Sequence, residues 1–530
     1  MKRLVGRFPS PGRGAWWRRQ GPVLLATAVL ALASSGGGRA AEDRSGAPAV
    51  GPPHTDVVTV GGRPVGPRIP SGFIGVSLEY RTVSGAEPEG PGGQDLVLAQ
   101  LIRNLAPGQT PIVRIGGDST DWTWWPLPGI QQPRGITYDL SPAWIASARE
   151  LALSTGARLI LGINLEADNT AIAAAEARGL IAGIGRRSIA ALEIGNEPEL
   201  YSALPWFHIR PGVPEFGRPL SYDLADYVRE FSRFARAIPR IPLAGPSTGA
   251  NAWIAGMGRL IAADRALRMV TFHAYALNPL GDAFRGRDCS TPLGDPAHPT
   301  VANLLASYAS RGLDQDVSPY VAIAHSHHLP FRVDEMNAVT CAGAPGVSDT
   351  SASALWVVNA LFTLARAGVD GVNIHTWRHS DGKLFDFHLV DRQWVGTVRP
   401  EYYGLLLFAR AAPPGSRLLP TEGPSSGPVQ SWAVRPPGGS THIVVINDSL
   451  THVRWVLVRP PAASRRATLE RLEAPSAYAS TGITLAGQSF GTQTTTGLLA
   501  GAVHSTVLRP SAGGYLVRLR AASAALLAIR

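Results

Sequence analysis

Eight short apolar segments alternate with segments of helical period between residues 73 and 377. In order they are F-I-G-V-S-L-E (73–79), P-I-V-R-I-G-G (111–117), R-L-I-L-G-I-N-L (158–165), A-L-E-I-G-N (191–196), I-P-L-A-G-P-S (241–247), M-V-T-F-H-A-Y (269–275), F-R-V-D-E (331–335) and G-V-N-I-H-T-W (371–377). Strands that alternate with helices form parallel sheets, and eight such units suffice to close a barrel. We therefore predict an α/β fold, with a (β/α)8 TIM barrel over residues 71–414.

Capping residues mark the ends of several helices between these segments. Ser141-Pro142 opens a helix that Gly156 closes, and Ser351 precedes one that ends near Gly368. Serine at the N-cap, proline in the first turn and glycine after the last turn are the usual signals.

The character of the chain changes after about residue 415. Short β-like runs such as V-Q-S-W-A-V-R and T-H-I-V-V-I-N follow one another, separated by turns rich in Gly, Pro and Ser. This pattern predicts a C-terminal all-β sandwich over residues 415–530. Residues 54–70 are predicted to be an N-terminal β segment that pairs with the C-terminal sheet, and within it V-V-T-V-G-G-R-P-V-G (57–66) resembles a hairpin. Residues 42–53 resemble a linker.

The first 41 residues have the layout of a secretory signal peptide. A basic region precedes an apolar run at 23–33, and small residues suited to cleavage follow near Ala40 and Ala41. The run is too short to indicate a membrane span. We expect a secreted, extracellular or periplasmic protein without stable membrane insertion, and the choice between the general and the twin-arginine export routes stays open.

The net charge of +10 does not indicate nucleic-acid binding, because most of it lies in the predicted signal peptide. Residues 1–41 contain seven basic residues and no acid, so only about +3 remains for the rest of the chain. No basic stripe with interleaved aromatic residues occurs, which argues against a nucleic-acid partner.

The chain contains two cysteines, Cys289 and Cys341. An even pair in an exported protein predicts one disulfide. Two cysteines alone cannot form a zinc site, and the histidines of H-S-H-H (325–328) are expected in a solvated loop. We therefore predict no metal and no cofactor.

Polar residues stand at the carboxyl ends of seven of the eight predicted strands. In a barrel these ends surround the active site, so the residues predict one convergent pocket. They are Glu79, Asp118, Asn164 with Glu166, Asn196 with Glu197, His273 with Tyr275, Glu335 with Asn337, and His375 with Trp377.

The segment L-E-I-G-N-E-P-E (192–199) contains three glutamates. Proline pushes the preceding residue towards extended backbone, so we expect Glu197 to finish the strand and face the barrel mouth. Glu193 lies inside the strand, where we expect a buried partner such as an arginine. Glu199 is expected to be a solvated loop acid or to start a helix.

Cleavage of a glycosidic bond needs a second carboxylate. In F-R-V-D-E, alternation places Glu335 on one face of the strand and Asp334 on the other, and Glu335 ends the strand, so it is the preferred candidate. A separation of about 5–5.5 Å between Glu197 and Glu335 would indicate a retaining mechanism.

Six motifs, taken in order, resemble glycoside hydrolase family 79, which contains β-glucuronidases and heparanase-like enzymes, within the clan of retaining (β/α)8 glycosidases. They are F-I-G-V-S-L-E, V-R-I-G-G-D-S-T-D, I-G-N-E-P-E, T-F-H-A-Y, R-V-D-E-M-N and G-V-N-I-H-T. The resemblance covers nearly the whole chain after the predicted signal peptide. It implies a carbohydrate or glycoside substrate, with Glu197 as acid/base and Glu335 as nucleophile.

The resemblance also implies contacts with the sugar. It places Tyr275 near the nucleophile, and Glu79, Asp118 and Asn196 on sugar hydroxyls. The strand-end residues His273, Asn337 and Trp377 complete the predicted substrate site. Aromatic side chains could stack on sugar faces or pack in the core; these are Trp122, Trp124, Trp125 and Trp377.

One departure from the family pattern concerns the sugar. Glucuronate-specific members tend to place tyrosine and glycine backbone donors just after the nucleophile, where this chain has Thr340, Cys341 and Ala342. A β-glucuronidase, a retaining β-glucosidase or other hexosidase of a related barrel family, and an inactive carbohydrate-binding barrel are therefore the alternatives.

Overall fold

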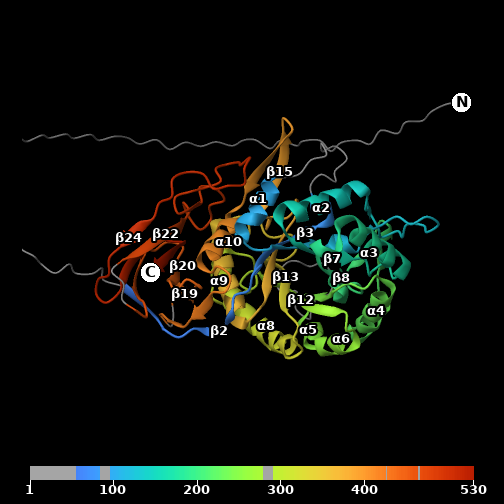
Figure 1. Ribbon diagram of the computed structural model, residues 1–530, viewed down its shortest axis with the longest axis horizontal. Coiled ribbons are helices and arrows are strands. Elements are labelled where there is room, and N and C mark those ends of the chain that lie inside the picture. The colour runs from blue at the N-terminus through green and yellow to red at the C-terminus, as the bar shows by residue number, and fades with distance from the viewer. Residues whose placement is uncertain (1–54, 84–95, 278–290, 425–426, 463–465) are drawn as a thin grey trace, which may run out of the picture. The chain divides into compact units, whose positions relative to one another are not determined.

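The computed structural model describes residues 55–83, 96–277, 291–424, 427–462 and 466–530 (Figure 1). The predicted signal peptide (1–41) and linker (42–53) lie outside the described residues, as does Cys289. Within the described part of the chain, no helix combines the length and apolar character that a membrane span requires.

Eight parallel strands form a closed barrel, which confirms the predicted fold. Going around the barrel, the strand order is β11-β12-β13-β14-β3-β4-β7-β8. Every predicted strand is present: β3 (Ile74–Glu79), β4 (Ile112–Gly116), β7 (Arg158–Ile163), β8 (Ile189–Ile194), β11 (Leu243–Thr248), β12 (Leu267–Leu277), β13 (Phe331–Val339) and β14 (Gly371–Thr376).

Helices surround these strands, as Figure 1 shows for α3, α4 and α6. Their bounds are α1 (Leu96–Leu105), α2 (Pro142–Thr155), α3 (Thr170–Ile184), α4 (Leu224–Ala237), α5 (Asn251–Ala255), α6 (Met257–Ala263), α7 (Val301–Leu304), α8 (Tyr308–Ser326), α9 (Ser351–Ala367) and α10 (Pro400–Ala411). The capping signals are used as expected in α2, where Ser141 Oγ accepts a hydrogen bond from the Trp144 amide and Gly156 is left-handed at φ 68°.

Several two-stranded sheets lie outside the closed barrel. They are β5 (Thr123–Trp124) with β6 (Tyr138–Asp139), β9 (Pro205–Arg210) with β10 (Val213–Phe216), and β15 (Phe385–Val390) with β16 (Gln393–Val398).

The C-terminal part of the chain forms two further sheets, of order β18-β1-β21-β25 and β2-β17-β19-β20-β26-β22-β23. Their strands are β17 (Arg417–Leu419), β18 (Thr421–Glu422), β19 (Val429–Arg435), β20 (Thr441–Asn447), β21 (Arg454–Arg459), β22 (Ala467–Glu473), β23 (Thr484–Leu485), β24 (Thr506–Leu508), β25 (Tyr515–Leu519) and β26 (Ser523–Ile529). A separate apolar cluster lies between them, with Val58, Ile443 and Val517 fully buried.

The N-terminal strands β1 (Thr55–Val60) and β2 (Val65–Arg68) lie in different sheets and do not form the expected hairpin with each other. Strand β1 pairs in parallel with β21 and antiparallel with β18, while β2 pairs with β17. Local alternation predicted two adjacent strands, but each completes a sheet whose other strands come from the far end of the chain.

An aromatic contact connects the barrel to the C-terminal sheets. Trp432 of β19 stacks on Phe362 of α9 with ring centroids 5.5 Å apart, and its indole N–H donates to Asn359 Oδ1 at 2.9 Å. Arg366 lies over the same indole ring. Helix α9 is buried along most of its length because it packs against α8, α10 and these sheets.

Candidate active site

A fully buried arginine organises the carboxyl ends of the barrel strands. Arg114 of β4 donates from Nε to Glu193 at 2.7 Å, from Nη1 to Glu335 at 2.7 Å and from Nη2 to Asn196 at 2.8 Å. Its Nε also lies 3.3 Å from Asp334. A buried charge requires such partners, so Arg114 is the arginine that the buried Glu193 was expected to have. The signal in the sequence was a charged residue inside the apolar run P-I-V-R-I-G-G.

A β-bulge in β13 changes the expected alternation. His273 is paired with Glu335 and Phe272 with Val333, so Asp334 is the extra residue. Strand β13 continues to Val339, and Glu335 therefore lies inside the strand and not at its end. The prediction that Asp334 faces away from Glu335 is wrong, because the bulge turns both acids towards Arg114.

The carboxylate of Glu335 is held by two strong donors. Tyr275 donates its hydroxyl to Oε1 at 2.6 Å, and Arg114 donates to Oε2 at 2.7 Å. Burial alone would raise the pKa of Glu335, but the positive charges of His375, His273 and Arg114 and the Tyr275 hydrogen bond lower it well below its usual range. Glu335 is therefore an ionised carboxylate across the working pH range.

Glu197 has a left-handed backbone, with φ 44° and ψ 55°. The expectation of extended backbone is wrong here, and β8 ends three residues earlier at Ile194. The conformation is held by two hydrogen bonds, from the Glu197 amide to the Ser247 carbonyl and from the Leu200 amide to the Glu197 carbonyl, each 2.8 Å long. Such strain is found where a functional side chain must be aimed.

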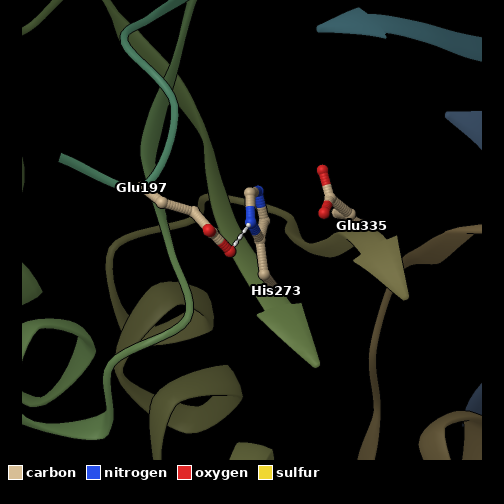
Figure 2. Close-up of side chains that lie close together, drawn as sticks. All are labelled: Glu197, His273 and Glu335. Carbon is tan, nitrogen blue, oxygen red and sulfur yellow. Dashed lines mark hydrogen bonds and ion pairs between the residues drawn. The ribbon is translucent and has the colours of Figure 1, made fainter. Parts of the chain in front are cut away.

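The two proposed catalytic carboxylates lie close together. One oxygen of Glu197, one of Glu335 and one ring nitrogen of His273 all lie within 4.8 Å of one another. Figure 2 shows these three side chains converging from separate elements of the barrel.

The imidazole of His273 is directed at Glu197. Its Nδ1 lies 2.8 Å from Glu197 Oε1, and its Nε2 lies 3.1 Å from Ser247 Oγ. Burial acts to lower the pKa of His273, but the charge of Glu335 and the hydrogen bond to Glu197 outweigh it and raise the pKa to about 9. His273 does not line the main cavity but lines a smaller one together with Glu197 and Tyr275, so its contact with the substrate stays a prediction.

Glu199 is not the solvated acid that the sequence indicated. Its Oε1 accepts hydrogen bonds from the amides of Gly249 at 2.6 Å and Ala250 at 3.1 Å. Burial and the neighbouring charge of Glu197 raise the pKa of Glu199 to about 7. It does start a short helical turn, Pro198–Leu200.

A cavity of about 470 Å³ opens above these groups. Its lining includes His375 and six of the residues predicted to catalyse the reaction or bind substrate, which are Glu79, Asp118, Glu197, Tyr275, Glu335 and Trp377. Asn196 lines a smaller adjoining groove with Asp118 and Glu197. The residue types suit an array of hydroxyls, because carboxylates and amides bind hydroxyl groups and aromatic faces pack on sugar rings.

Glu79 is fixed at one wall of this cavity. Its Oε2 accepts hydrogen bonds from the Ser119 amide at 2.9 Å and from the Ser119 hydroxyl, and its Oε1 lies 3.4 Å from His375 Nε2. Gly117 has φ 72°, and a Cβ at this position would lie only 2.1 Å from Glu79 Oε1. Glycine in V-R-I-G-G is therefore required by the approach of this carboxylate.

Asn337 does not line the cavity, so its predicted role in substrate binding is corrected. Its amide donates to the carbonyls of His375 and Gly382, both at 2.8 Å, and its Oδ1 accepts from the Ala338 amide. All of its polar atoms therefore hold neighbouring backbone. It supports the position of His375.

The tryptophans divide between the cavity and the core. Trp122 and Trp377 line the cavity, whereas Trp124 is buried in a small apolar cluster and Trp125 packs against Gly179. Only the first two can contact a bound sugar among these four.

The segment after the nucleophile strand also lines the cavity. Thr340, Cys341 and Ala342 contribute to its wall, and the last two are left-handed, with φ 54° and φ 71°. The predicted disulfide partner, Cys289, lies outside the described residues, so this disulfide stays a prediction.

Glu197, His273 and Glu335 have the ligand types and spacing that could hold a metal ion. The groups are already paired, however. Glu335 accepts from Arg114 and Tyr275, and Glu197 binds His273. A cation would compete with Arg114 and with a protonated imidazole for the same oxygens.

A closed (β/α)8 barrel with a pair of close carboxylates that line one cavity defines the class of protein as a glycoside hydrolase. Residues 438–526 match the glycosyl hydrolase family 79 C-terminal beta domain. A β-glucuronidase of Aspergillus niger is 24% identical over 416 residues, covering 71% of this chain and 70% of that protein. The predicted resemblance to family 79 is confirmed, and this chain is a glycoside hydrolase.

Solved structures share the architecture. A 4-O-α-L-rhamnosyl-β-D-glucuronidase from Fusarium oxysporum has a TM-score of 0.64 at 17% identity, covering 89% of this chain and 100% of that one. A family 51 arabinofuranosidase from Xanthomonas axonopodis pv. citri has a TM-score of 0.61 at 16% identity, covering 90% and 100%. At these identities the likeness establishes the fold.

Proposed function

We propose that the protein is an exported, retaining β-glycosidase that hydrolyses β-glucuronides. The observation that carries the proposal is the close approach of Glu197 and Glu335, which have oxygens within 4.8 Å of each other. Retaining enzymes have carboxyl groups about 5–5.5 Å apart, because one of them attacks the sugar directly. Inverting enzymes need a wider gap that holds a water molecule.

The electrostatics support a division of roles. Glu335, kept ionised by Arg114 and its neighbours, attacks C1 of the sugar while the glycosidic C1–O bond breaks and Glu197 gives its proton to the leaving oxygen. Water then gives a proton to Glu197 and adds its oxygen to C1, which releases Glu335. Glu197 ends the cycle protonated again, so all atoms and charges balance.

Basic side chains at the cavity support a sugar with a carboxylate. Arg81, Arg378 and His379 line the same cavity as the catalytic pair, and a uronate would find cationic partners there. The relative from Aspergillus niger is a β-glucuronidase, which supports the same substrate class. A neutral hexoside is the competing substrate, since Glu79 and Asp118 in this wall suit hydroxyl groups.

A panel of aryl β-glucuronide, glucoside, galactoside and xyloside tests the substrate. We expect turnover of the glucuronide with a kcat/KM at least about tenfold above that of the others. Faster hydrolysis of the glucoside would replace glucuronate with a neutral hexose, and release of no phenol from any substrate would indicate a carbohydrate-binding barrel. The first sugar released should be the β-anomer by NMR if the mechanism is retaining.

Glu335→Gln tests the nucleophile, and we expect it to abolish turnover. Azide should restore reaction of Glu335→Ala and give the α-glycosyl azide, whereas azide with Glu197→Ala should give the β-glycosyl azide. Glu150→Gln, the same change on the exposed surface of α2, is the matched control. Unchanged turnover in Glu335→Gln would refute the assignment.

We propose that residues 1–41 direct export and are removed. The basic and apolar regions and the small residues near Ala40 support this proposal. Expression of the full chain in a bacterial host should deliver mature protein to the periplasm or medium, and N-terminal sequencing should begin after Ala40 or Ala41. An intact N-terminus in the cytoplasm would contradict it.

A further inference from the structure

Three oxygens of two buried carboxyl groups near the proposed nucleophile accept no hydrogen bond from the described residues. Both oxygens of Asp334 and one oxygen of Glu193, Oε1, are buried and accept no hydrogen bond there. Both side chains have no exposed surface. They are adjacent, because the same nitrogen, Arg114 Nε, lies 2.7 Å from Glu193 and 3.3 Å from Asp334.

Buried acceptors without donors are rare and costly, so their partner has to be identified. A carboxylate is an acceptor only, whereas a protonated carboxyl group donates one hydrogen bond. One proton on Asp334 would therefore make one of its oxygens a donor and supply the donor that Glu193 Oε1 lacks.

The balance of charge around Arg114 requires the same proton. His375 is balanced by Glu79, whose Oε1 lies 3.4 Å from its Nε2. The other two cations, Arg114 and His273, are surrounded by four carboxyl groups. The four are Glu193, Glu197, Asp334 and Glu335. Two uncompensated negative charges in a buried site would be strongly unfavourable. One proton on Glu197, which the acid role requires, and one on a second acid leave the cluster neutral.

We propose that Asp334 is protonated in the resting enzyme and donates its O–H to Glu193, as a positioning residue for the nucleophile Glu335. This inference rests on the proposed role of Glu335. With Asp334 neutral, Arg114 balances two carboxylates, Glu193 and Glu335, in place of three. Arg114 Nη1 remains directed at Glu335, so the nucleophile stays ionised and keeps its orientation.

The groups that face Asp334 come from each neighbouring element. Glu193 of β8 opposes its ionisation, and Arg114 of β4 and His273 of β12, 3.8 Å from Oδ1, favour it. From β13 itself, Glu335 binds the same guanidinium and Arg332 is the neighbouring cation. Burial and then the charge of Glu193 raise the pKa of Asp334 well above its usual range, while Arg114 keeps the pKa of Glu193 low despite burial.

Asp334→Asn tests the proposal most directly. The amide is uncharged and can donate its N–H to Glu193, so it replaces a protonated carboxyl group without changing the charge. We expect kcat/KM within about threefold of the wild type and a pH profile with both limbs unmoved. Asp334→Ala, which removes the donor, should lose about tenfold in kcat/KM.

Asp121→Asn is the matched control. Asp121 is also buried, but its oxygens accept hydrogen bonds from the amides of Leu165, Glu166 and Asn196 and from the Tyr201 hydroxyl. An amide N–H placed against these donors should lower the melting temperature. Asp334→Asn should not lower it.

Infrared difference spectroscopy at neutral pH supplies a readout that needs no turnover. The difference spectrum of wild type minus Asp334→Asn should contain one protonated-carboxyl band, while the band of Glu197 is common to both proteins and cancels. The proposal is overturned if that band is unchanged, if either limb of the pH profile moves by about one unit or more in Asp334→Asn, or if this variant melts as early as Asp121→Asn. An enzyme that cleaves no glycoside would refute the proposed function, while the infrared and melting results would still decide this inference.

Discussion

The guanidinium of Arg114 on β4 donates a hydrogen bond of 2.7 Å to Glu335 on β13, and the two residues are 221 positions apart in the sequence. The contact sets the charge of the proposed nucleophile, because both groups are buried and each is the other's direct partner. Several measurements can test what this contact and its neighbours do.

Replacement of Arg114 by glutamine should move the acid limb of the pH profile. Without the cation, the pKa of Glu335 rises, so the nucleophile becomes protonated at a higher pH and kcat/KM falls on the acid side. We expect a loss of about 100-fold or more, together with a loss of folding free energy of about 3–5 kcal/mol from the unpaired acids. Arg158→Gln, at the exposed start of β7, is the control. An unmoved limb would contradict the proposed role.

Tyr275→Phe should slow catalysis without unfolding the protein. It removes one donor to Glu335 Oε1 but leaves Arg114 in place. A hydrogen bond to a charged group contributes about 1.5–3 kcal/mol, which corresponds to a fall in kcat of about 10- to 150-fold. Tyr402→Phe removes a buried hydroxyl far from the cavity, which donates to the Leu101 carbonyl, and should leave kcat unchanged. Equal kinetics for the two variants would contradict the prediction.

His273 should make folding stability depend on pH. Its pKa is raised from 6.5 to about 9 in the folded protein, so the folded state binds the proton more tightly than the unfolded state. The resulting stabilisation is fully present below about pH 6.5 and is lost as the pH rises to 9, on the order of 3 kcal/mol. Urea unfolding at a series of pH values should show this decline in the wild type, and His273→Gln should flatten it over the same interval.

Glu199 should make the folded protein less stable as the pH rises from 4.5 to about 7, below the interval in which His273 acts. Its raised pKa favours the neutral acid, so stability falls between pH 4.5 and about 7 and the full cost persists above 7. Glu199→Gln keeps a carbonyl for the Gly249 and Ala250 amides and should raise the free energy of unfolding at alkaline pH. We expect a gain on the order of 2 kcal/mol, allowing for partial solvent screening. A variant less stable than the wild type at high pH would argue against a raised pKa.

Trp432→Ala should lower stability without changing KM. The indole stacks on Phe362 and donates to Asn359, and none of these residues lines the cavity. A truncation of this size in a buried site costs about 3–5 kcal/mol. Trp455→Ala, a partly exposed tryptophan on the other sheet, should cost much less. A change in KM would contradict this prediction and would show that the contact affects substrate binding at the barrel mouth.

The sequence predicted those parts of the structure that follow from local pattern. All eight barrel strands could be located, because each is a short apolar run and seven of the eight runs are followed by the polar residues of the predicted pocket. Glu197 and Glu335 could be placed at one end of the barrel for the same reason. The caps of α2 were also readable, since Ser141, Pro142 and Gly156 act within one or two turns.

Features that depend on distant partners could not be predicted. The bulge at Asp334 reverses an inference from alternation, because the register of β13 is set by β12 and β14. The left-handed backbone of Glu197 depends on a hydrogen bond to Ser247, which lies 50 residues further along the chain. His273 and Asn337 were predicted at strand ends, but both lie inside longer strands and their partners lie within the protein.

Strand β1 has a consequence for the order in which the chain can fold. It emerges early during synthesis, yet it lies between β18 (Thr421–Glu422) and β21 (Arg454–Arg459), which are made near the end of synthesis. Contacts of such long range form slowly, so the barrel can assemble before β1 pairs with β18 and β21. A shortened protein that begins at the barrel would leave the edge of β21 uncovered, where it could pair with another chain and aggregate. Expression of the active enzyme should therefore depend on residues 55–60 even though none of them lies near the cavity.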